Sequence, residues 1–416
     1  MIKADILIVG GGAAGLMAAC RMTKTGCSAV LVEKGSVPGK KILITGKGRC
    51  NITNMAPWEE FKTHIHPDSG FLKSSFFAFS NENVKEFFEL GGVPVKIERG
   101  MRLFPESDKS VTVRDFLWNA ATGAGVNVLT NHNVVNVQFT GKSFITDVQA
   151  DDGKFLSMDQ IVSKAVIITT GGKSYPYTGS TGAGYEFASS FGHTIEKTFP
   201  SLTALRPLNY DMRLSGIHLK NVGLSLVIDG DCVDTREGEL DFTNNGIEGS
   251  LGFQLSRRAV VALNKGQRVS LRLDLKPALN SETLAERVSR ESYGKNIVMK
   301  KFLSGYMPMN LIDPFISSNP DISLRNLPVR LKKWTFKISD YTGYERCVVT
   351  AGGVSLNEIS RKDMSSKLVP GLFFAGEVLD LDGDTGGYNL QIAFSTGSAA
   401  AAGAVAYVLK NQDTGR

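Results

Sequence analysis

The first 33 residues contain two apolar runs, separated by a group of glycines and a helical stretch, and this order predicts a β-α-β unit. Residues 4–9 form an apolar run rich in β-branched side chains, and three glycines follow. Residues 13–23 have helical character, and residues 28–33 form a second apolar run. Strand, tight turn, helix and strand is the order that a parallel β-α-β unit requires. The pattern therefore predicts an α/β fold.

The chain up to residue 199 continues this α/β pattern. Apolar positions recur at helical spacing in residues 80–90 and 111–121. Short alternating runs then predict strands at residues 126–129, 134–139 and 144–148. Residues 165–169 are apolar almost throughout, which predicts a central strand that is buried on both faces.

A different pattern begins near Pro200. Short strand-like runs separated by polar turns predict a small β-rich domain, with strands at residues 224–228 and 269–275. Residues 280–329 then have a helical pattern. The β pattern of the first region returns after them, at residues 348–350 and 372–375. The simplest architecture is one α/β domain interrupted by an insertion of about residues 200–345.

The composition is that of a folded chain with a large core. Of 416 residues, 42% are apolar and 21% are charged, and the formal net charge is +6. These values exclude a wholly disordered chain. The 44 glycines follow no Gly-X-Y period, so they serve turns and close approaches of the backbone, as in loops that cradle a ligand.

The five cysteines include no Cys-x-x-Cys pair, which argues against a disulfide framework, a zinc site and a redox dithiol. We therefore expect a reducing compartment and a cytoplasmic location. Residues 392–409 are rich in alanine and approach the length of a membrane span. The run Ser-Thr-Gly-Ser at residues 395–398 favours a packed core helix instead, so no membrane span is expected.

A Gly-x-Gly-x-x-Gly motif lies between the first strand and the first helix. Its candidate cofactor residues are Gly10, Gly12, Ala13, Ala14 and Gly15. Gly10 makes the tight turn, Gly12 lets the backbone approach a pyrophosphate at the helix N-terminus, and Gly15 allows helix and strand to pack closely. An ordinary glycine turn is the alternative interpretation.

Glu33 follows Gly10 by 23 residues and ends the second strand. A carboxylate at this place accepts hydrogen bonds from ribose hydroxyls and repels a 2′-phosphate. Because strand, glycines, helix and carboxylate occur in the correct order and spacing, the sequence predicts dinucleotide binding.

A strand and turn near the C-terminus favour FAD as the dinucleotide. The strand at residues 372–375 leads into an acidic turn, and a glycine-rich segment then opens the last helix. FAD suits such a return, because its ribityl chain and ring extend away from the first β-α-β unit. The candidate cofactor residues here are Gly376, Glu377, Asp382, Gly386, Gly387, Tyr388, Asn389 and Leu390. The alternative for Asp380, Asp382 and Asp384 is a solvated acidic turn or a calcium loop.

Several segments together resemble one known family. They are Glu33-Lys34, residues 38–54 with the run Thr-Gly-Lys-Gly-Arg-Cys-Asn-Ile-Thr-Asn, residues 170–182, and residues 350–354 with the run Thr-Ala-Gly-Gly-Val. The chain is similar in these segments to the BaiN/RdsA family of NAD(P)/FAD-dependent oxidoreductases, also labelled the aminoacetone oxidase family. The resemblance covers about residues 1–200 and 345–416, and within the insertion mainly residues 240–255.

The resemblance implies an FAD-binding Rossmann-like domain interrupted by a β-barrel and a small helical subdomain. The expected boundaries are 1–199 and 346–416 for the Rossmann-like domain, 200–277 and 334–345 for the barrel, and 278–333 for the helical subdomain. Further cofactor contacts are implied for Lys34, Lys41, Gly48, Arg49, Asn51, Thr170 and Gly171. The chain departs from the family at residues 246–250, where Gly-Ile-Glu-Gly-Ser replaces Gly-x-Ser-Gly-Pro and adds the carboxylate of Glu248.

The chemistry implied is transfer of a hydride equivalent between flavin N5 and a small organic substrate. Amine oxidation and reduction of unsaturated steroid-type acids are both associated with the family, and the residues do not choose between them. The sequence has no second Gly-x-Gly-x-x-Gly domain, so if NAD(P)H is the reductant of the flavin, it is expected to bind only transiently; the sequence leaves open whether NADH, NADPH or the substrate reduces the flavin. No catalytic residue and no oligomeric state follow from the sequence.

A histidine pair and one cysteine are two further candidate chemical groups in the sequence. We expect the His64-x-His66 pair to lie in a solvated loop, and no metal is assigned. Cys50 is either a redox thiol or a small packed residue, and the lack of a nearby partner cysteine favours packing.

The alternative function is that of an FAD-dependent RNA-modifying or RNA-binding protein. Basic residues flank Trp334, and such a stripe holds phosphates while the aromatic ring stacks a base. These residues are Arg325, Arg330, Lys332, Lys333 and Lys337. Because acidic residues are interspersed through the chain, a solvated basic face is favoured, and a small-molecule substrate is expected rather than a nucleic acid.

Overall fold

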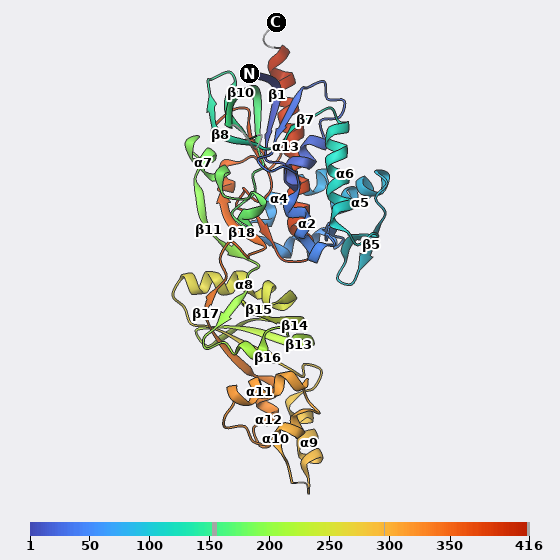
Figure 1. Ribbon diagram of the computed structural model, residues 1–416, viewed down its shortest axis with the longest axis vertical. Coiled ribbons are helices and arrows are strands. Elements are labelled where there is room, and N and C mark those ends of the chain that lie inside the picture. Colours follow the sequence, from blue (N-terminus) through green and yellow to red (C-terminus); the bar gives the residue numbers. More distant parts are fainter. Residues whose placement is uncertain (152–155, 295, 414–416) are drawn as a thin grey trace. The chain divides into compact units, whose positions relative to one another are not determined.

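The computed structural model describes residues 1–151, 156–294 and 296–413 (Figure 1). The chain divides into two compact units. Unit 1 comprises Met1–Phe199 and Val349–Arg416, and unit 2 comprises Pro200–Val348. The predicted fold class, a Rossmann-like α/β domain interrupted by a β-barrel and helices, is confirmed. Each unit is described by itself below.

Unit 1 contains both parallel and antiparallel strands. Its strands are β1 (Ile2–Val9), β2 (Ala29–Val32), β3 (Thr53–Asn54), β4 (Ile65–His66), β5 (Val95–Glu98), β6 (Arg102–Pro105), β7 (Asn127–Leu129), β8 (His132–Phe139), β9 (Phe144–Asp151), β10 (Leu156–Ile168), β11 (Ile195–Ser201), β18 (Val349–Val354), β19 (Leu372–Phe374) and β20 (Asp382–Gly383). Its α-helices are α1 (Ala13–Cys20), α2 (Lys40–Ile44), α3 (Trp58–Phe61), α4 (Ser69–Ala78), α5 (Asn81–Leu90), α6 (Ser110–Gly123), α7 (Ala183–Ser190) and α13 (Tyr388–Asp413). Short 3₁₀ helices are η1 (Thr45–Gly48), η2 (Lys62–His64), η3 (Pro176–Thr178) and η5 (Leu356–Glu358).

The main sheet of unit 1 has seven strands. Six follow the order β7-β2-β1-β10-β9-β8, and β19 pairs with the C-terminal part of β10. The strands from β7 to β10 and β19 are parallel, whereas β9 and β8 are antiparallel. Val166, Ile167 and Ile168 of β10 are fully buried, which confirms the predicted central strand. In a parallel sheet of this kind, ligands bind beyond the carboxyl ends of the strands.

The C-terminal helix α13 is a core element of unit 1 (Figure 1). It packs against α1, α4 and β10. The approach to α1 is close, because a Cβ atom placed on Gly397 would lie 2.4 Å from the carbonyl oxygen of Ala14. Among the described residues, α13 is the one helix long and apolar enough to cross a membrane, and 67% of its apolar window is buried inside the protein.

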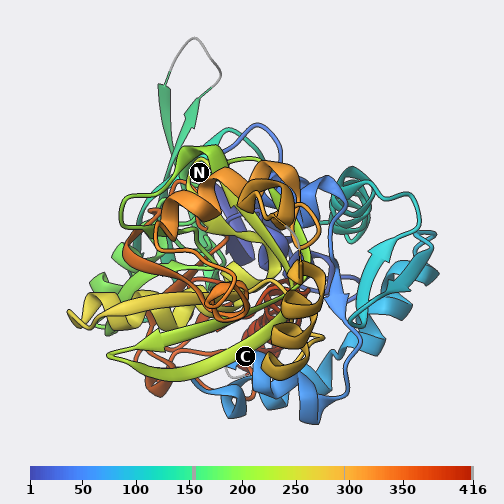
Figure 2. The same cartoon turned by 90° about the horizontal axis from the view of Figure 1, so that it is seen from below.

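Unit 2 is a closed barrel of six antiparallel strands with a group of short helices (Figure 2). The barrel order is β12-β15-β14-β13-β16-β17. The strands are β12 (Leu205–Pro207), β13 (His218–Ile228), β14 (Asp231–Thr243), β15 (Gly246–Glu248), β16 (Val269–Asp274) and β17 (Trp334–Tyr341). The helices are η4 (Met212–Leu214), α8 (Gly249–Asn264), α9 (Ser281–Ser292), α10 (Met299–Leu303), α11 (Met309–Ser318) and α12 (Leu327–Lys332).

Trp334 belongs to the hydrophobic core of unit 2. Its side chain is only 1% exposed, and its ring packs against Phe315 with 5.1 Å between ring centroids. Neighbouring basic groups are bound locally, since Lys332 pairs with Asp274 at 2.7 Å and donates to two backbone carbonyls. The alternative in which Trp334 stacks a nucleic-acid base is therefore wrong, because the ring has no exposed face.

Candidate cofactor and active site

The turn between β1 and α1 contains glycines with different surroundings. Gly10 has a φ of +102°, and a Cβ atom there would lie 2.8 Å from the carbonyl oxygen of Thr169. A Cβ atom on Gly15 would lie 1.9 Å from the carbonyl oxygen of Gly10, so both positions require glycine. At Gly12, the N-cap of α1, no described atom lies within 4 Å of such a Cβ. The open space at Gly12 therefore faces a helix N-terminus, whose backbone N–H groups attract an anion.

Glu33 closes this glycine turn from the end of β2. Its side chain is buried, and its Oε2 accepts a hydrogen bond from the backbone N–H of Gly11 at 2.8 Å. Its Oε1 accepts another from the N–H of Gly35 at 2.7 Å. These bonds hold the carboxylate in place, and its remaining lone pairs are of the kind that ribose hydroxyls bind.

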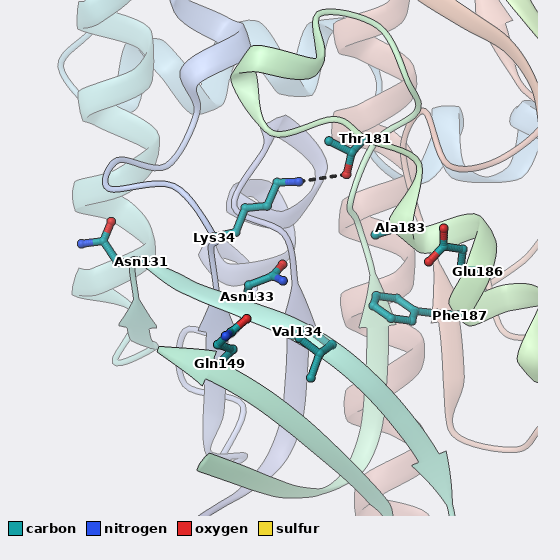
Figure 3. Close-up of a pocket in the computed structure, with 10 residues that line it drawn as sticks. Lys34, Asn131, Asn133, Val134, Gln149, Thr181, Ala183, Glu186 and Phe187 are labelled. Carbon is teal, nitrogen blue, oxygen red and sulfur yellow. Dashed lines mark hydrogen bonds between the residues drawn. The ribbon is translucent and has the colours of Figure 1, made fainter. Parts of the chain in front are cut away.

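A cavity of about 510 Å³ begins at Lys34, the residue after Glu33 (Figure 3). Lys34 Nζ donates to Thr181 Oγ1 at 3.0 Å, and burial lowers the pKa of Lys34 although the nearby Glu33 carboxylate acts in the opposite direction. The rest of the lining combines amides, apolar side chains and one carboxylate, from Asn131, Asn133, Val134, Val135, Gln149, Ala183, Glu186 and Phe187. Amides for the edges of a base and apolar groups for its faces suit a nucleoside.

Glu377, just after β19, joins four segments of unit 1, and we call this group the Glu377 junction. Its Oε2 accepts from Lys41 Nζ at 2.6 Å, and its Oε1 accepts from the backbone N–H of Thr350 at 2.9 Å and from the hydroxyl of Ser174. Thr350 Oγ1 in turn accepts from the N–H of Ser174 at 3.0 Å. The junction ties the start of α2, the loop after β10, β18 and the turn after β19 together.

Two predicted cofactor residues carry buried oxygen atoms without a partner. They are Asn51 Oδ1 and Thr170 Oγ1, which are among five buried side-chain polar atoms in the described residues that make no hydrogen bond. Buried polar groups are almost always paired in folded proteins. Unpaired acceptors at these two places therefore fit a site that a polar ligand completes.

The structure places Arg49 and Cys50 in other surroundings. The Arg49 guanidinium bonds Glu98 and Asp108, both at 2.5 Å, and lies 4.3 Å from the ring centroid of Phe104. The hydrogen bonds that Arg49 donates to these carboxylates raise its pKa, while the neighbouring Gly48 is exposed. Cys50 is fully buried, and burial raises its pKa to about 12, which fits a packed residue rather than a redox thiol.

The start of α13 lies against β3. Gly387 has a φ of +103°, and a Cβ atom there would lie 2.4 Å from the carbonyl carbon of Thr53. Asn54 Nδ2 donates to the carbonyl oxygen of Gly386 at 3.1 Å. Asn389 is used within the same turn, because its Nδ2 donates to the carbonyl of Gly383 at 2.7 Å and its Oδ1 accepts from the N–H of that residue.

His64, His66 and Asp384 form a hydrogen-bonded cluster beside this helix start, which we call the His–Asp–His cluster. His64 Nδ1 lies 2.9 Å from Asp384 Oδ2, and His66 Nε2 lies 3.1 Å from Asp384 Oδ1. Asp384 is 7% exposed. Burial acts to raise its pKa, but the bonds from both imidazoles outweigh burial and lower the pKa to about 2. The expectation of a solvated loop at His64-x-His66 is therefore wrong.

Pairing of β20 with β4 brings these residues together although more than 300 positions separate them in sequence. The ring of Tyr388, the first residue of α13, stacks on the His64 imidazole with 4.5 Å between centroids. Burial raises the pKa of Tyr388, with smaller contributions from Glu60 and Asp384. Among the described residues, no group of three His, Cys, Asp or Glu side chains has a geometry suited to a metal ion.

The remaining predicted cofactor residues lie around the two helix starts. Ala13 and Ala14 are the first residues of α1, and a Cβ atom on Gly376 would lie 2.8 Å from the Cβ of Ala14. The turn after β19 thus touches the first helix. Three others lie in the loop after β10, in β20 and in the first turn of α13, and they are Gly171, Asp382 and Leu390.

Comparison with known proteins gives this geometry a context. The family model described as "HI0933-like protein Rossmann domain" matches residues 4–403. The chain belongs to the HI0933-like Rossmann family. This family is the one whose BaiN/RdsA-type members the sequence resembles, and the chain is an FAD-dependent oxidoreductase with a substrate that the family alone does not define.

Two curated relatives cover nearly the whole chain. The 3-dehydro-bile acid delta(4,6)-reductase of Clostridium scindens is 29% identical over 410 residues, 94% of this chain and 96% of that protein. The ribosomal RNA dihydrouridine synthase of Haemophilus influenzae is 30% identical over 412 residues, 95% of this chain and 97% of that protein.

A solved structure shows the same fold. The 3-ketosteroid-delta4-(5alpha)-dehydrogenase from Rhodococcus jostii has a TM-score of 0.51 with 14% identity, and the match covers 97% of each chain.

The described residues fit FAD, which is the cofactor of the family. Open space at Gly12 accommodates a pyrophosphate at the N-terminus of α1, and the fixed Glu33 carboxylate suits the adenosine ribose. The unpaired oxygens of Asn51 and Thr170 supply acceptors for its polar groups. Sequence reasoning placed Asp384 only in an acidic turn and Ser174 only in a segment that resembles the family, because their bonding partners His64, His66 and Glu377 are distant in sequence.

Proposed function

We propose that this protein reduces a carbon–carbon double bond conjugated to a carbonyl group in a small organic substrate, with NAD(P)H as the reductant of FAD. The observation that supports it is the chemistry shared by two full-length relatives. Saturation of a bile-acid dienone and conversion of uridine to dihydrouridine both add two hydrogens across a double bond next to a carbonyl. The sequence alone left the direction of the reaction open, and this shared chemistry favours reduction.

FAD, when bound, supplies the hydride for this reduction at its N5 position. The protein chain binds FAD and adjusts its reactivity. Residues around Gly12 and Glu33 would hold the pyrophosphate and ribose, and the cavity at Lys34 would take the adenine. At the other end, the first N–H groups of the 26-residue helix α13 have no partners within the helix and carry the positive end of its dipole. They favour negative charge on an oxygen or nitrogen placed near Gly387.

A stopped-flow experiment tests the proposal. The purified flavoprotein is reduced anaerobically with NADH or NADPH and then mixed with a 3-oxo-4-ene steroid acid. We expect rapid return of the oxidised flavin spectrum and a product heavier by two hydrogens. Reduction of the flavin by aminoacetone, combined with reoxidation by dioxygen alone, would instead show an amine oxidase and contradict the proposal.

RNA modification is the second candidate function, and the dihydrouridine synthase relative favours it. Residues 278–333 of unit 2 carry nine Lys and Arg against five Asp and Glu, a modest basic excess. Reduced enzyme mixed with unmodified ribosomal RNA distinguishes the two candidates, because only an RNA-modifying enzyme would reoxidise and leave dihydrouridine in the transcript.

A cytoplasmic location is part of the proposal. All five cysteines are free thiols, and three of them are buried. This state suits a reducing compartment, in which NAD(P)H is also present.

A further inference from the structure

The His–Asp–His cluster has the arrangement of an oriented proton donor. Asp384 Oδ2 accepts a hydrogen bond from Nδ1 of His64. Nε2 of that imidazole has no partner among the described residues. The His64 side chain is 22% exposed, whereas the Asp384 side chain is 10% exposed. A buried carboxylate on one ring nitrogen fixes the tautomer and stabilises the imidazolium, so that the other nitrogen can exchange a proton.

The second imidazole, that of His66, gives the cluster another group that can carry a proton. His66 bonds the other oxygen of the same carboxylate and is 32% exposed, so it contacts both Asp384 and solvent. One carboxylate neutralises one imidazolium, and a second positive charge on the cluster gains less from it. His66 therefore connects solvent to the carboxylate that holds His64.

Charged and titratable groups lie on each element that packs near His64. Asp384 lies on the turn after β20, Tyr388 on α13 and His66 on β4. Glu60 on α3 acts on the Tyr388 hydroxyl, and Lys62, on the same 3₁₀ turn as His64, pairs with Glu59 at the surface. Asp384 is thus the charged group that bonds the imidazole directly.

The cluster also lies at the part of unit 1 where the flavin ring is expected. His64 stacks on Tyr388, which directly follows Gly386 and Gly387. Asp384 lies only two residues before this glycine pair, and the Gly386 carbonyl is bound by Asn54. The oriented imidazole and the helix start that favours negative charge are therefore neighbours.

We propose that His64 is the proton donor of the reduction, with Asp384 and His66 as the residues that position and reprotonate it. This inference rests on the proposed function. One carbon of the conjugated double bond gains the hydride that reduced FAD supplies, and the π electron pair moves to the neighbouring carbon. That pair takes the proton from Nε2 of the His64 imidazolium, which becomes neutral imidazole. His66 or solvent then returns a proton to the cluster.

Separate half-reactions test the inference. In His64→Gln, reduction of the flavin by NAD(P)H should stay within about twofold of wild type, while its reoxidation by the enone should slow by about 100-fold or more. His64→Gln should also change how the reoxidation rate depends on pH, because the proposed proton donor is absent. Lys62→Gln, which removes a charge from the same 3₁₀ turn, serves as the control and should leave both rates unchanged.

A spectroscopic measurement keeps the inference testable if His64→Gln does not fold. In protein labelled with ¹⁵N-histidine, the neutral His64 ring should carry its hydrogen on Nδ1, facing Asp384, and Asp384→Asn should weaken this preference and slow reoxidation about tenfold or more. A hydrogen on Nε2 in the wild type, or unchanged reoxidation in His64→Gln, would overturn the inference. If the wild type reduces no conjugated acceptor, the proposed function fails, and the ring tautomer still reports on the cluster.

Discussion

The starts of α1 and α13 both contain glycines, but the space beside the glycine is open in α1 and is filled by protein backbone in α13. At Gly12 a Cβ atom would meet no described atom within 4 Å, whereas at Gly387 it would lie 2.4 Å from the backbone of Thr53. The first glycine therefore reserves space for a ligand, and the second lets two segments of the protein touch. A glycine-rich helix start is thus not by itself evidence of ligand contact. The surroundings of each Cβ position distinguish the two cases.

The largest expected effect is on cofactor binding at the first of these sites. Gly12→Val places a branched side chain in the open space in front of α1, where φ is −76° and a side chain is sterically allowed. The fold should persist, but FAD affinity should fall on the order of 100-fold, about 2.7 kcal/mol. Flavin absorbance per folded chain measures this. Gly123→Val, at an exposed glycine that also has open space, is the matched control.

Gly387→Ala should act on folding instead. The new methyl group would meet the Thr53 backbone, and φ of +103° is strained for alanine, so we expect a loss of roughly 2–4 kcal/mol in unfolding free energy. Gly12→Ala should cost less than about 1 kcal/mol in the same urea titration. Equal destabilisation by the two alanines would remove the distinction between the two helix starts.

The two helix starts should also differ in how the free energy of unfolding depends on acidic pH, because the ionisable side chain of Asp384 lies at the start of α13. The pKa of Asp384 is lowered from 3.8 to about 2, so its stabilising effect is complete above pH 3.8 and is lost as pH falls towards 2. This amounts to about 2 kcal/mol. This contribution can be measured by urea unfolding of the wild type and of Asp384→Asn, at pH values about one unit apart between pH 5 and pH 2. The variant should show a flatter dependence, and parallel curves would contradict the assignment.

The smallest effect on the cofactor is expected from unit 2. Glu248 precedes α8 and accepts from Thr243 Oγ1 at 3.1 Å. We expect Glu248→Ala and Glu248→Ser to change turnover several-fold, because a carboxylate is replaced where the family has serine, and to leave FAD content unchanged. Glu239→Ala, at an exposed carboxylate on β14, is the control. Loss of flavin from a folded Glu248 variant would show that cofactor binding is not confined to unit 1.

Features that depend on neighbouring residues could be predicted from the sequence. The first β-α-β unit, the helix at Asn81–Leu90 and the central strand β10 are local patterns of apolar spacing and glycine. The helix α1 nevertheless ends at Cys20, earlier than its apolar pattern, which extends to residue 23. Boundaries are less regular than cores because the last turn has fewer hydrogen bonds to hold it.

Features that depend on distant pairing could not be predicted. The His–Asp–His cluster exists only because β20 pairs with β4, and neither two-residue strand has a sequence signature. In unit 2, β14 consists largely of polar and charged residues, so its thirteen residues show little apolar alternation. Trp334 illustrates a missed local signal: Trp334, Phe336 and Ile338 alternate with exposed residues as in a strand, whereas the flanking lysines suggested a basic surface.

The pairing of β11 with β18 has a consequence for how the chain is assembled. The N–H of Val348 donates to the carbonyl of Leu202, and the N–H of Ser355 donates to that of Thr194, so the outgoing and returning segments run side by side. A Cβ atom on Gly352 would lie 2.4 Å from the carbonyl oxygen of Lys197, which shows how closely they meet. To the rest of unit 1, the whole inserted segment is equivalent to a hairpin loop. Its length and content can therefore change between relatives without altering the register of the strands that carry it.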